Sequence, residues 1–173
     1  MKKLKDVDYK ILFELIKNSK TSDRKLAKRI GVSQPTVTRR RAGLEKKGLI
    51  EYTGIPNFEK LGLDIMAFHL LHWKPESYQG MTKMEDFLKK VKVFVSEHPS
   101  IIFASSGQGL GMSRLTITLH KSYSDFVDFR KEIESSWGQY IAKYDNFIVS
   151  LRSDNVIRQF TFRYLADYLK KKR

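Results

Sequence analysis

A run of hydrogen-bonding and cationic side chains between residues 33 and 41, SQPTVTRRR, has the chemistry needed to read DNA. Arg pairs bidentately with guanine, Gln pairs with adenine, and Ser or Thr reaches bases or phosphates. Ser33 is a good helix cap, and Pro35 is tolerated in a first turn because its missing N–H needs no partner there. The predicted DNA contacts of this helix are Ser33, Gln34, Pro35, Thr36, Thr38, Arg39, Arg40 and Arg41. The alternative is a solvated helix that is rich in arginine.

A second short helix precedes this one and completes a helix-turn-helix over residues 21–48. Ser22 caps it, and apolar Leu26 and Ile30 are spaced for one buried face. Gly31 supplies the sharp turn, and Gly48 ends the second helix. Three basic residues of the first of these helices are predicted phosphate contacts: Lys25, Lys28 and Arg29.

The flanking segments predict a winged helix-turn-helix domain in the first fifty-odd residues. Residues 4–17 place apolar side chains on one face and form a scaffold helix. After Gly48, residues 49–52 indicate a short strand and residues 54–56 a turn, as in a small wing.

Positive charge is concentrated at the two ends of the chain. Residues 1–50 hold 15 Lys and Arg against 5 Asp and Glu, a net charge of +10. Residues 152–173 hold 7 against 2, a net charge of +5, and residues 51–151 hold 11 against 12. The positive field therefore coincides with the predicted DNA-reading helix, as expected for a protein whose partner is double-stranded DNA.

The remainder of the chain predicts the order strand, helix, strand, strand, helix, strand, which is a ferredoxin-like βαββαβ unit. The expected strands are residues 63–73, 101–105, 114–120 and one within 140–152, and the expected helices are residues 82–97 and 123–137. The first strand is apolar on both faces, so a partner must cover the face that the helices leave open. A second copy of the chain is the predicted partner. The alternative is that the apolar residues between 156 and 169 fold back over the sheet.

The composition argues against several other classes of protein. The chain has no Cys, which excludes disulfides and thiolate zinc ligands. Its start is charged, and its longest apolar segment, residues 65–73, is too short to span a bilayer, so we expect a soluble cytoplasmic protein without a membrane partner. His69 and His72 point to opposite faces of a strand, and His98 and His120 are isolated. We therefore expect no catalytic site, no metal and no cofactor.

Residues 8–55 followed by a βαββαβ unit resemble the Lrp/AsnC family of leucine-responsive and asparagine regulators, over about 150 residues. The positions that carry the resemblance are Asp8, Ile11, Leu12, Leu15, Asn18, Leu26, Ala27, Gly31, Ser33, Val37, Arg39, Arg40, Leu44, Gly48 and Ile50. The resemblance implies a transcriptional regulator that dimerises through its C-terminal domain, assembles into tetramers or octamers, and binds an amino acid between subunits. We expect a DNA-binding domain at residues 1–57, a ferredoxin-like domain at 58–153 and a basic extension at 154–173.

Three features depart from the family pattern: Arg41, the turn between the second and third strands, and the basic C-terminal tail. Arg41 occupies a helix position that the family fills with an aliphatic residue. The glycine-rich turn between the second and third strands, residues 105–114, lacks the acidic residue of the amino-acid-binding members, which weakens the prediction of amino-acid sensing. The candidate effector contacts in that turn are Ser105, Ser106, Gly107 and Gln108. Two alternative functions are a sequence-indifferent architectural DNA-binding protein and a tetrapyrrole-decarboxylase-like enzyme on the same fold.

Overall fold

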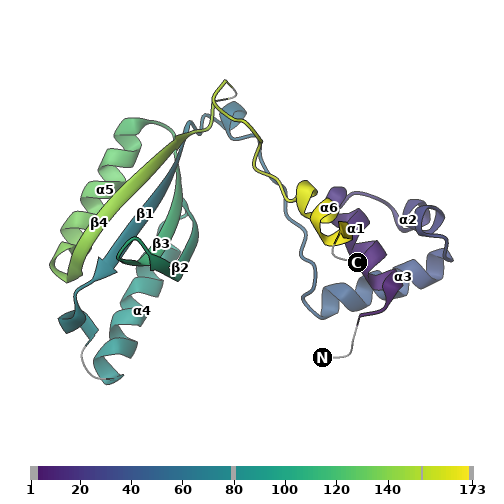
Figure 1. Cartoon of the computed structure of the whole chain (residues 1–173), viewed down its shortest axis with the longest axis horizontal. Coiled ribbons are helices and arrows are strands. Elements are labelled where there is room, and N and C mark those ends of the chain that lie inside the picture. The colour runs from purple at the N-terminus through teal and green to yellow at the C-terminus, as the bar shows by residue number, and fades with distance from the viewer. Residues whose placement is uncertain (1–3, 79–80, 153, 172–173) are drawn as a thin grey trace. The chain divides into compact units, whose positions relative to one another are not determined.

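The computed structural model describes residues 4–78, 81–152 and 154–171 of the 173-residue chain. The chain forms two compact units, and each is considered by itself (Figure 1). The first unit comprises Met1–Ile55 together with Arg158–Arg173, and the second comprises Pro56–Ile157.

The N-terminal segment of the first unit forms the helices α1 (Asp6–Lys17), α2 (Asp23–Ile30) and α3 (Gln34–Lys46). Ser22 caps α2 by accepting a hydrogen bond from the Lys25 N–H, and Gly31 turns the chain with a φ of +73°. Their shared core consists of Ile11, Leu15, Leu26, Ala27, Val37 and Leu44. The predicted helix-turn-helix is therefore present, although α1 begins two residues later than expected.

The segment that follows α3 differs from its prediction. Residues 49–52 form no strand, so the expected short wing strand is wrong in this structure. A strand needs a hydrogen-bonded neighbour, and the described part of the first unit contains no other strand. Leu49 and Ile50 instead pack against the helical core, and the Tyr52 hydroxyl donates to Glu45 at 2.7 Å.

A sixth helix, α6 (Arg163–Lys171), joins the first unit from the far end of the chain. It packs against α1, where Ala166 is fully buried and Asp167 forms a 3.0 Å ion pair with Lys17 (Figure 1). The C-terminal segment thus extends the helical unit, and the alternative in which it folds back over the sheet is not what the structure shows.

The second unit has the predicted βαββαβ order. Its elements are β1 (Ile65–Trp73), α4 (Met81–Glu97), β2 (Ile101–Gly109), β3 (Met112–His120), α5 (Tyr123–Trp137) and β4 (Ile141–Ser150), with short 3-10 turns at Glu59–Leu61, Pro75–Tyr78 and Gly138–Tyr140. The strands lie in the antiparallel order β2-β3-β1-β4, which confirms the ferredoxin-like fold. β2 continues four residues beyond its predicted end, because residues 106–109 still approach β3 before the turn.

Helices α4 and α5 both cover the same face of this sheet (Figure 1). Leu71 and Trp73 of β1 pack there against Phe87 of α4 and Trp137 of α5. Alternate residues of β1 point to the other face, which no element formed by the described residues of the second unit covers. Register pairing places an apolar row across the four strands of this open face: Phe103, Ile117, Phe68 and Phe147.

Candidate nucleic-acid interface

The solvent-facing side of α3 carries Gln34, Pro35 and Arg39, all of which are exposed. This orientation follows from Val37 and Leu44, which lie seven residues apart and anchor the opposite side of the helix in the core. In the described part of the chain, Gln34 and Arg39 make no side-chain hydrogen bond or ion pair, so their polar groups are available to a partner.

Arg40 points along the flank of α3 toward α1. Its Nη1 atom donates to both carboxylate oxygens of Asp8, at 2.9 and 3.1 Å, and the two side chains are only 23% and 11% exposed. Burial raises the pKa of Asp8, but the N–H of Lys5 and the charge of Arg40 outweigh it and hold that pKa below its usual value. Arg40 therefore ties α3 to α1, a role that the sequence prediction missed.

Arg41 is the centre of a network that holds α2, α3 and the following segment together. Its guanidinium donates to Asp23 at 3.1 Å, to Glu45 at 3.1 Å and to the Tyr52 hydroxyl at 2.9 Å. It also donates to the backbone carbonyl of Thr21 at 3.3 Å. This explains how a cation replaces an aliphatic residue at this helix position: its partners neutralise it within the unit.

The hydroxyl groups on the first turns of α3 are also engaged. The Thr38 hydroxyl lies 2.7 Å from Asp23 Oδ2 and 3.1 Å from the carbonyl of Gln34, and the Ser33 and Thr36 hydroxyls bond each other at 2.8 Å. Ser33 occupies the cap position without making the side-chain cap bond that we expected. These contacts orient the first turns of the helix before any partner arrives.

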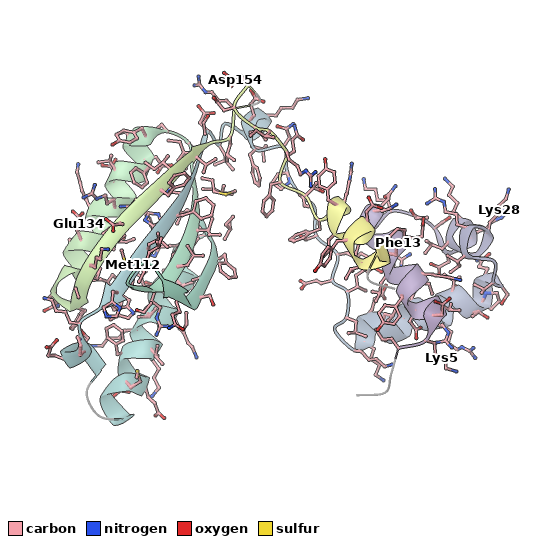
Figure 2. The ribbon with its side chains drawn as sticks, in the orientation of Figure 1. Lys5, Phe13, Lys28, Met112, Glu134 and Asp154 are labelled. Carbon is pink, nitrogen blue, oxygen red and sulfur yellow. The ribbon has the colours of Figure 1, made fainter. Side chains whose placement is uncertain are left out.

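On α2, Lys25 and Lys28 are exposed, and Lys28 extends away from the helical unit in Figure 2. Arg29 forms a 2.7 Å ion pair with Glu14 of α1, so part of its charge is compensated. Lys47, which the prediction omitted, is exposed at the end of α3. Its eight-residue separation from Arg39 places both on one flank of the helix, a helical spacing that is visible in the sequence.

The predicted effector residues lie at the end of β2, close to the β2–β3 turn. All four are exposed, and the Ser106 hydroxyl accepts a hydrogen bond from Arg114. The Ser105 hydroxyl donates to the carbonyl of Ser106 at 3.1 Å. Ser105, Ser106, Gly107 and Gln108 therefore share one strand end, and ligand binding by them stays a prediction.

A chain of buried polar groups beneath the helices was not predicted. His69 is fully buried and bonds the Tyr144 hydroxyl and the Thr118 hydroxyl, each at 2.8 Å, and Thr118 bonds His120 at 2.7 Å. Burial, reinforced by the charge of His120, lowers the pKa of His69 to about 4. The prediction that His120 is isolated is therefore wrong. The two rings are brought together by strands whose pairing is not visible in a single sequence.

Residues 4–78, 81–152 and 154–171 contain no group of three or more His, Asp or Glu placed to hold a metal ion. Within the same part of the chain, every helix is too short or too polar to cross a bilayer.

Comparison with known proteins identifies the class of the DNA-binding domain. Residues 4–51 match a model of winged helix-turn-helix DNA-binding domains. The chain is 30% identical over 108 residues to the HTH-type transcriptional regulator LrpA of Pyrococcus horikoshii, covering 58% of this chain and 77% of that protein. The chain belongs to the Lrp/AsnC family of transcriptional regulators.

Solved structures agree with this assignment. LrpC of Bacillus subtilis superposes with a TM-score of 0.69 at 26% identity, covering 85% of this chain and 94% of that one. A transcriptional regulator from Neisseria meningitidis, solved as a complex with L-Met, shares the fold at a TM-score of 0.71 and 20% identity, covering 94% and 99%. The chain spans about half the length of the uncharacterized Pyrococcus HTH-type regulators that it matches at 36–38% identity.

Proposed function

We propose that this protein is a sequence-specific DNA-binding transcriptional regulator that inserts α3 into the major groove. The observation that carries the proposal is that the exposed side of α3 presents polar side chains that the rest of the unit does not engage. Among the described residues, the side chains of Gln34 and Arg39 have no partner there, while the neighbouring Arg40 and Arg41 fix the helix in place. A preorganised helix with a free Gln group suits bidentate reading of adenine, and a free Arg group beside it can anchor the helix on a phosphate. We propose a cytoplasmic location for such a regulator.

Phosphate contacts in this proposal come from Lys25 and Lys28, which lie on the helix that crosses the DNA backbone in a helix-turn-helix. Ser33 and Thr36 lie at the first turn of α3, the part of such a helix that enters the groove deepest. Thr38 retains a methyl group for contact with thymine while its hydroxyl stays on Asp23. Arg29, Arg40 and Arg41 contribute positive potential, reduced by their carboxylate partners.

We also propose that the regulator acts as a dimer that pairs the open sheet faces of two copies. Phe103 and Phe147 are 49% and 65% exposed in this face, and Phe147 lies 6.4 Å from Phe68 between ring centroids. Isolated exposed aromatics are common, but a row of apolar residues across all four strands marks an interaction surface. A twofold dimer presents two copies of α3 to half-sites about 34 Å apart, or a multiple of that spacing. Assembly of such dimers into tetramers or octamers of the chain stays an expectation from the family.

Modulation by a small ligand is a further part of the proposal. The fold relative from Neisseria was solved with L-Met, and the β2–β3 hairpin of this chain presents serine hydroxyls and an Arg114 guanidinium at its surface. These groups can bind a carboxylate, although Ser106 and Arg114 already bond each other. The test is isothermal titration of the twenty amino acids. The site is supported if the native chain binds one of the amino acids and Ser106→Ala weakens that binding. Absence of binding to all twenty contradicts it.

The base-reading assignment is tested by selecting preferred sites from random DNA with the native chain and with Gln34→Ala. We expect the variant to lose its preference at one base pair of each half-site, a change of about 10-fold or more in discrimination. Gln139→Ala, an exposed Gln on the other unit, is the matched control and keeps the native preference. An unchanged site with Gln34→Ala shows that α3 does not read bases through this residue.

A further inference from the structure

A hollow of about 260 Å³ lies between α1 and α3, beside the side of α3 that is proposed to enter the groove. It is lined by Asp8, Arg39, Arg40, Gly43, Leu44 and Lys47. Neither Gly43 nor Lys47 was among the predicted DNA contacts. The structure brings both to one basic depression.

Gly43 has no evident role in the packing of the chain itself. A Cβ atom placed on Gly43 would meet nothing within 4 Å, and its φ angle is not among the positive ones, so an L-amino acid fits. Glycine in a helix interior is nevertheless less favourable than alanine by roughly 1 kcal/mol. A glycine that the fold does not need, on a helix face beside a basic hollow, indicates that something outside the chain approaches closely there.

The charges around the hollow favour an anion. Asp8 is the only acidic residue of the lining, and Arg40 already neutralises it through two hydrogen bonds at 2.9 and 3.1 Å. The charges of Arg39 and Lys47 are left over, because neither forms an ion pair within the described residues. Lys47 lines the same hollow, and its charge helps to hold the pKa of Asp8 below its usual value. The lining therefore has a net charge of about +2 to offer a ligand.

We propose that this hollow seats one phosphate group of the DNA backbone, held by Arg39 and Lys47 over the bare backbone of Gly43. The proposal rests on the proposed DNA-binding function and adds a contact that fixes how deeply α3 enters the groove. Arg and Lys side chains are the usual phosphate ligands, and phosphate contacts set the register of a protein on DNA without reading its sequence. A free phosphate monoester presents the same chemistry, and the experiment separates the two sources.

The test titrates a fixed duplex containing the selected site across a range of salt concentrations. Lys47→Gln is expected to weaken binding and to reduce the slope of log K against log salt by about 0.9, the value of one released phosphate contact. Lys131→Gln makes the same charge change on α5 and leaves the slope unchanged, which separates the site from the total charge. Both variants keep the native sequence preference, unlike Gln34→Ala.

Gly43→Ala provides the second, independent arm. It fills the floor of the hollow and strengthens the helix, so its thermal midpoint is expected to rise while its affinity for DNA falls by about 5-fold or more. A folding defect lowers both quantities together and is thereby distinguished. If the native chain binds DNA while Gly43→Ala and Lys47→Gln bind it with native affinity and native salt slope, the phosphate seat is wrong and the proposed function stands.

Inorganic phosphate, followed by amide NMR shifts, reads the hollow without DNA. We expect only weak shifts at tens of millimolar, localised to residues 39–47 and absent in Gly43→Ala. Saturation below about 1 mM would overturn the DNA-backbone assignment in favour of a free phosphate ligand. If the native chain binds no DNA, the proposed function fails, and the assignment of the hollow to a DNA phosphate fails with it.

Discussion

Arg39 and Arg40 are adjacent in sequence but have different structural roles. One helical step rotates a side chain by about 100°, so Arg39 faces solvent while Arg40 reaches back to Asp8. A buried pair of this kind adds little when intact, but removal of one partner leaves the other charge uncompensated. Arg40 is therefore a determinant of stability, and Arg39 is a determinant of binding.

We expect Arg40→Ala to lower the unfolding free energy of the helical unit by about 1–3 kcal/mol, because Asp8 loses its partner. Arg39→Ala is expected to stay within about 0.5 kcal/mol of the native value and to weaken DNA binding by about 10-fold or more. Urea unfolding followed by helical circular dichroism, together with DNA titration, measures both. Equal stability of Arg40→Ala and the native chain contradicts the structural role of the ion pair.

The types of the interface residues could be predicted, but their partners could not. Helical spacing alone predicts that Gln34 and Arg39 face solvent. It does not predict the partner of Arg40, which lies 32 residues away on α1. The network of Arg41 likewise depends on Asp23 and Tyr52, which the tertiary fold brings together. Sequence periodicity reports which way a side chain points, and it does not report what it meets.

At the scale of elements, the buried polar chain of the sheet makes the second unit sensitive to acid. Burial lowers the pKa of both His69 and His120, with Asp125 partly opposing the shift of His120. An unfolded histidine titrates near 6.5. Below that pH the unfolded chain binds more protons than the folded one, so stability is complete above pH 6.5 and falls as pH drops toward 4.

For His69 alone this linkage predicts a loss of roughly 2 kcal/mol between pH 7.5 and pH 5. The chain has two tryptophans, and Trp73 and Trp137 both lie in the second unit, so urea unfolding followed by tryptophan fluorescence isolates the effect. His69→Gln is expected to flatten the pH dependence. A flat native profile over this range refutes the buried neutral state of His69.

The open face of the sheet is the proposed dimer interface, and a charge placed in it tests that proposal. Phe147→Asp places a charge in the proposed dimer interface, and we expect the dimer to dissociate at least ~100-fold more readily, since two copies lose a buried aromatic each. Tyr123→Ser is the matched control, because Tyr123 on α5 is as exposed as Phe147, at 65%. Analytical ultracentrifugation measures both. A native chain that sediments as a monomer, or a Phe147→Asp chain that dimerises normally, counts against the interface.

Most elements could be predicted because their apolar periodicity is strong. The presence of α5 and of the four strands, and their order along the chain, follow from their apolar patterns and from helix capping. The absence of the predicted wing strand at residues 49–52 and the extension of β2 could not be foreseen, since a strand exists only through its neighbour. The same reason hid the contact between His69 and His120, which depends on the pairing of β1 with β3.

At the scale of the whole molecule, the helical unit is built from both ends of the chain. The sheet unit is inserted between the segment after α3 and the segment before α6, so two connections join the units. α6 is amphipathic in sequence, but nothing in that pattern identifies α1 as its partner. A contact between residues 150 positions apart requires the tertiary fold.

We expect Ala166→Asp to release α6, because it introduces an unpaired charge at a fully buried position against α1. Hydrogen exchange should then show loss of protection over residues 163–171 and faster exchange in α1. Asp167→Asn removes only the exposed ion pair with Lys17, a contact worth about 0–1 kcal/mol, and serves as the control. Native protection in Ala166→Asp would disprove the docking of α6 on α1.

The most direct test of the central claim is selection of genomic fragments by the native chain at near-physiological salt, followed by titration of the best fragment against a scrambled copy. Sequence-specific regulation predicts a recurrent twofold site bound at least ~10³-fold more tightly than the scrambled DNA. Near-equal affinities with a steep salt dependence would contradict the account and indicate a sequence-indifferent architectural protein.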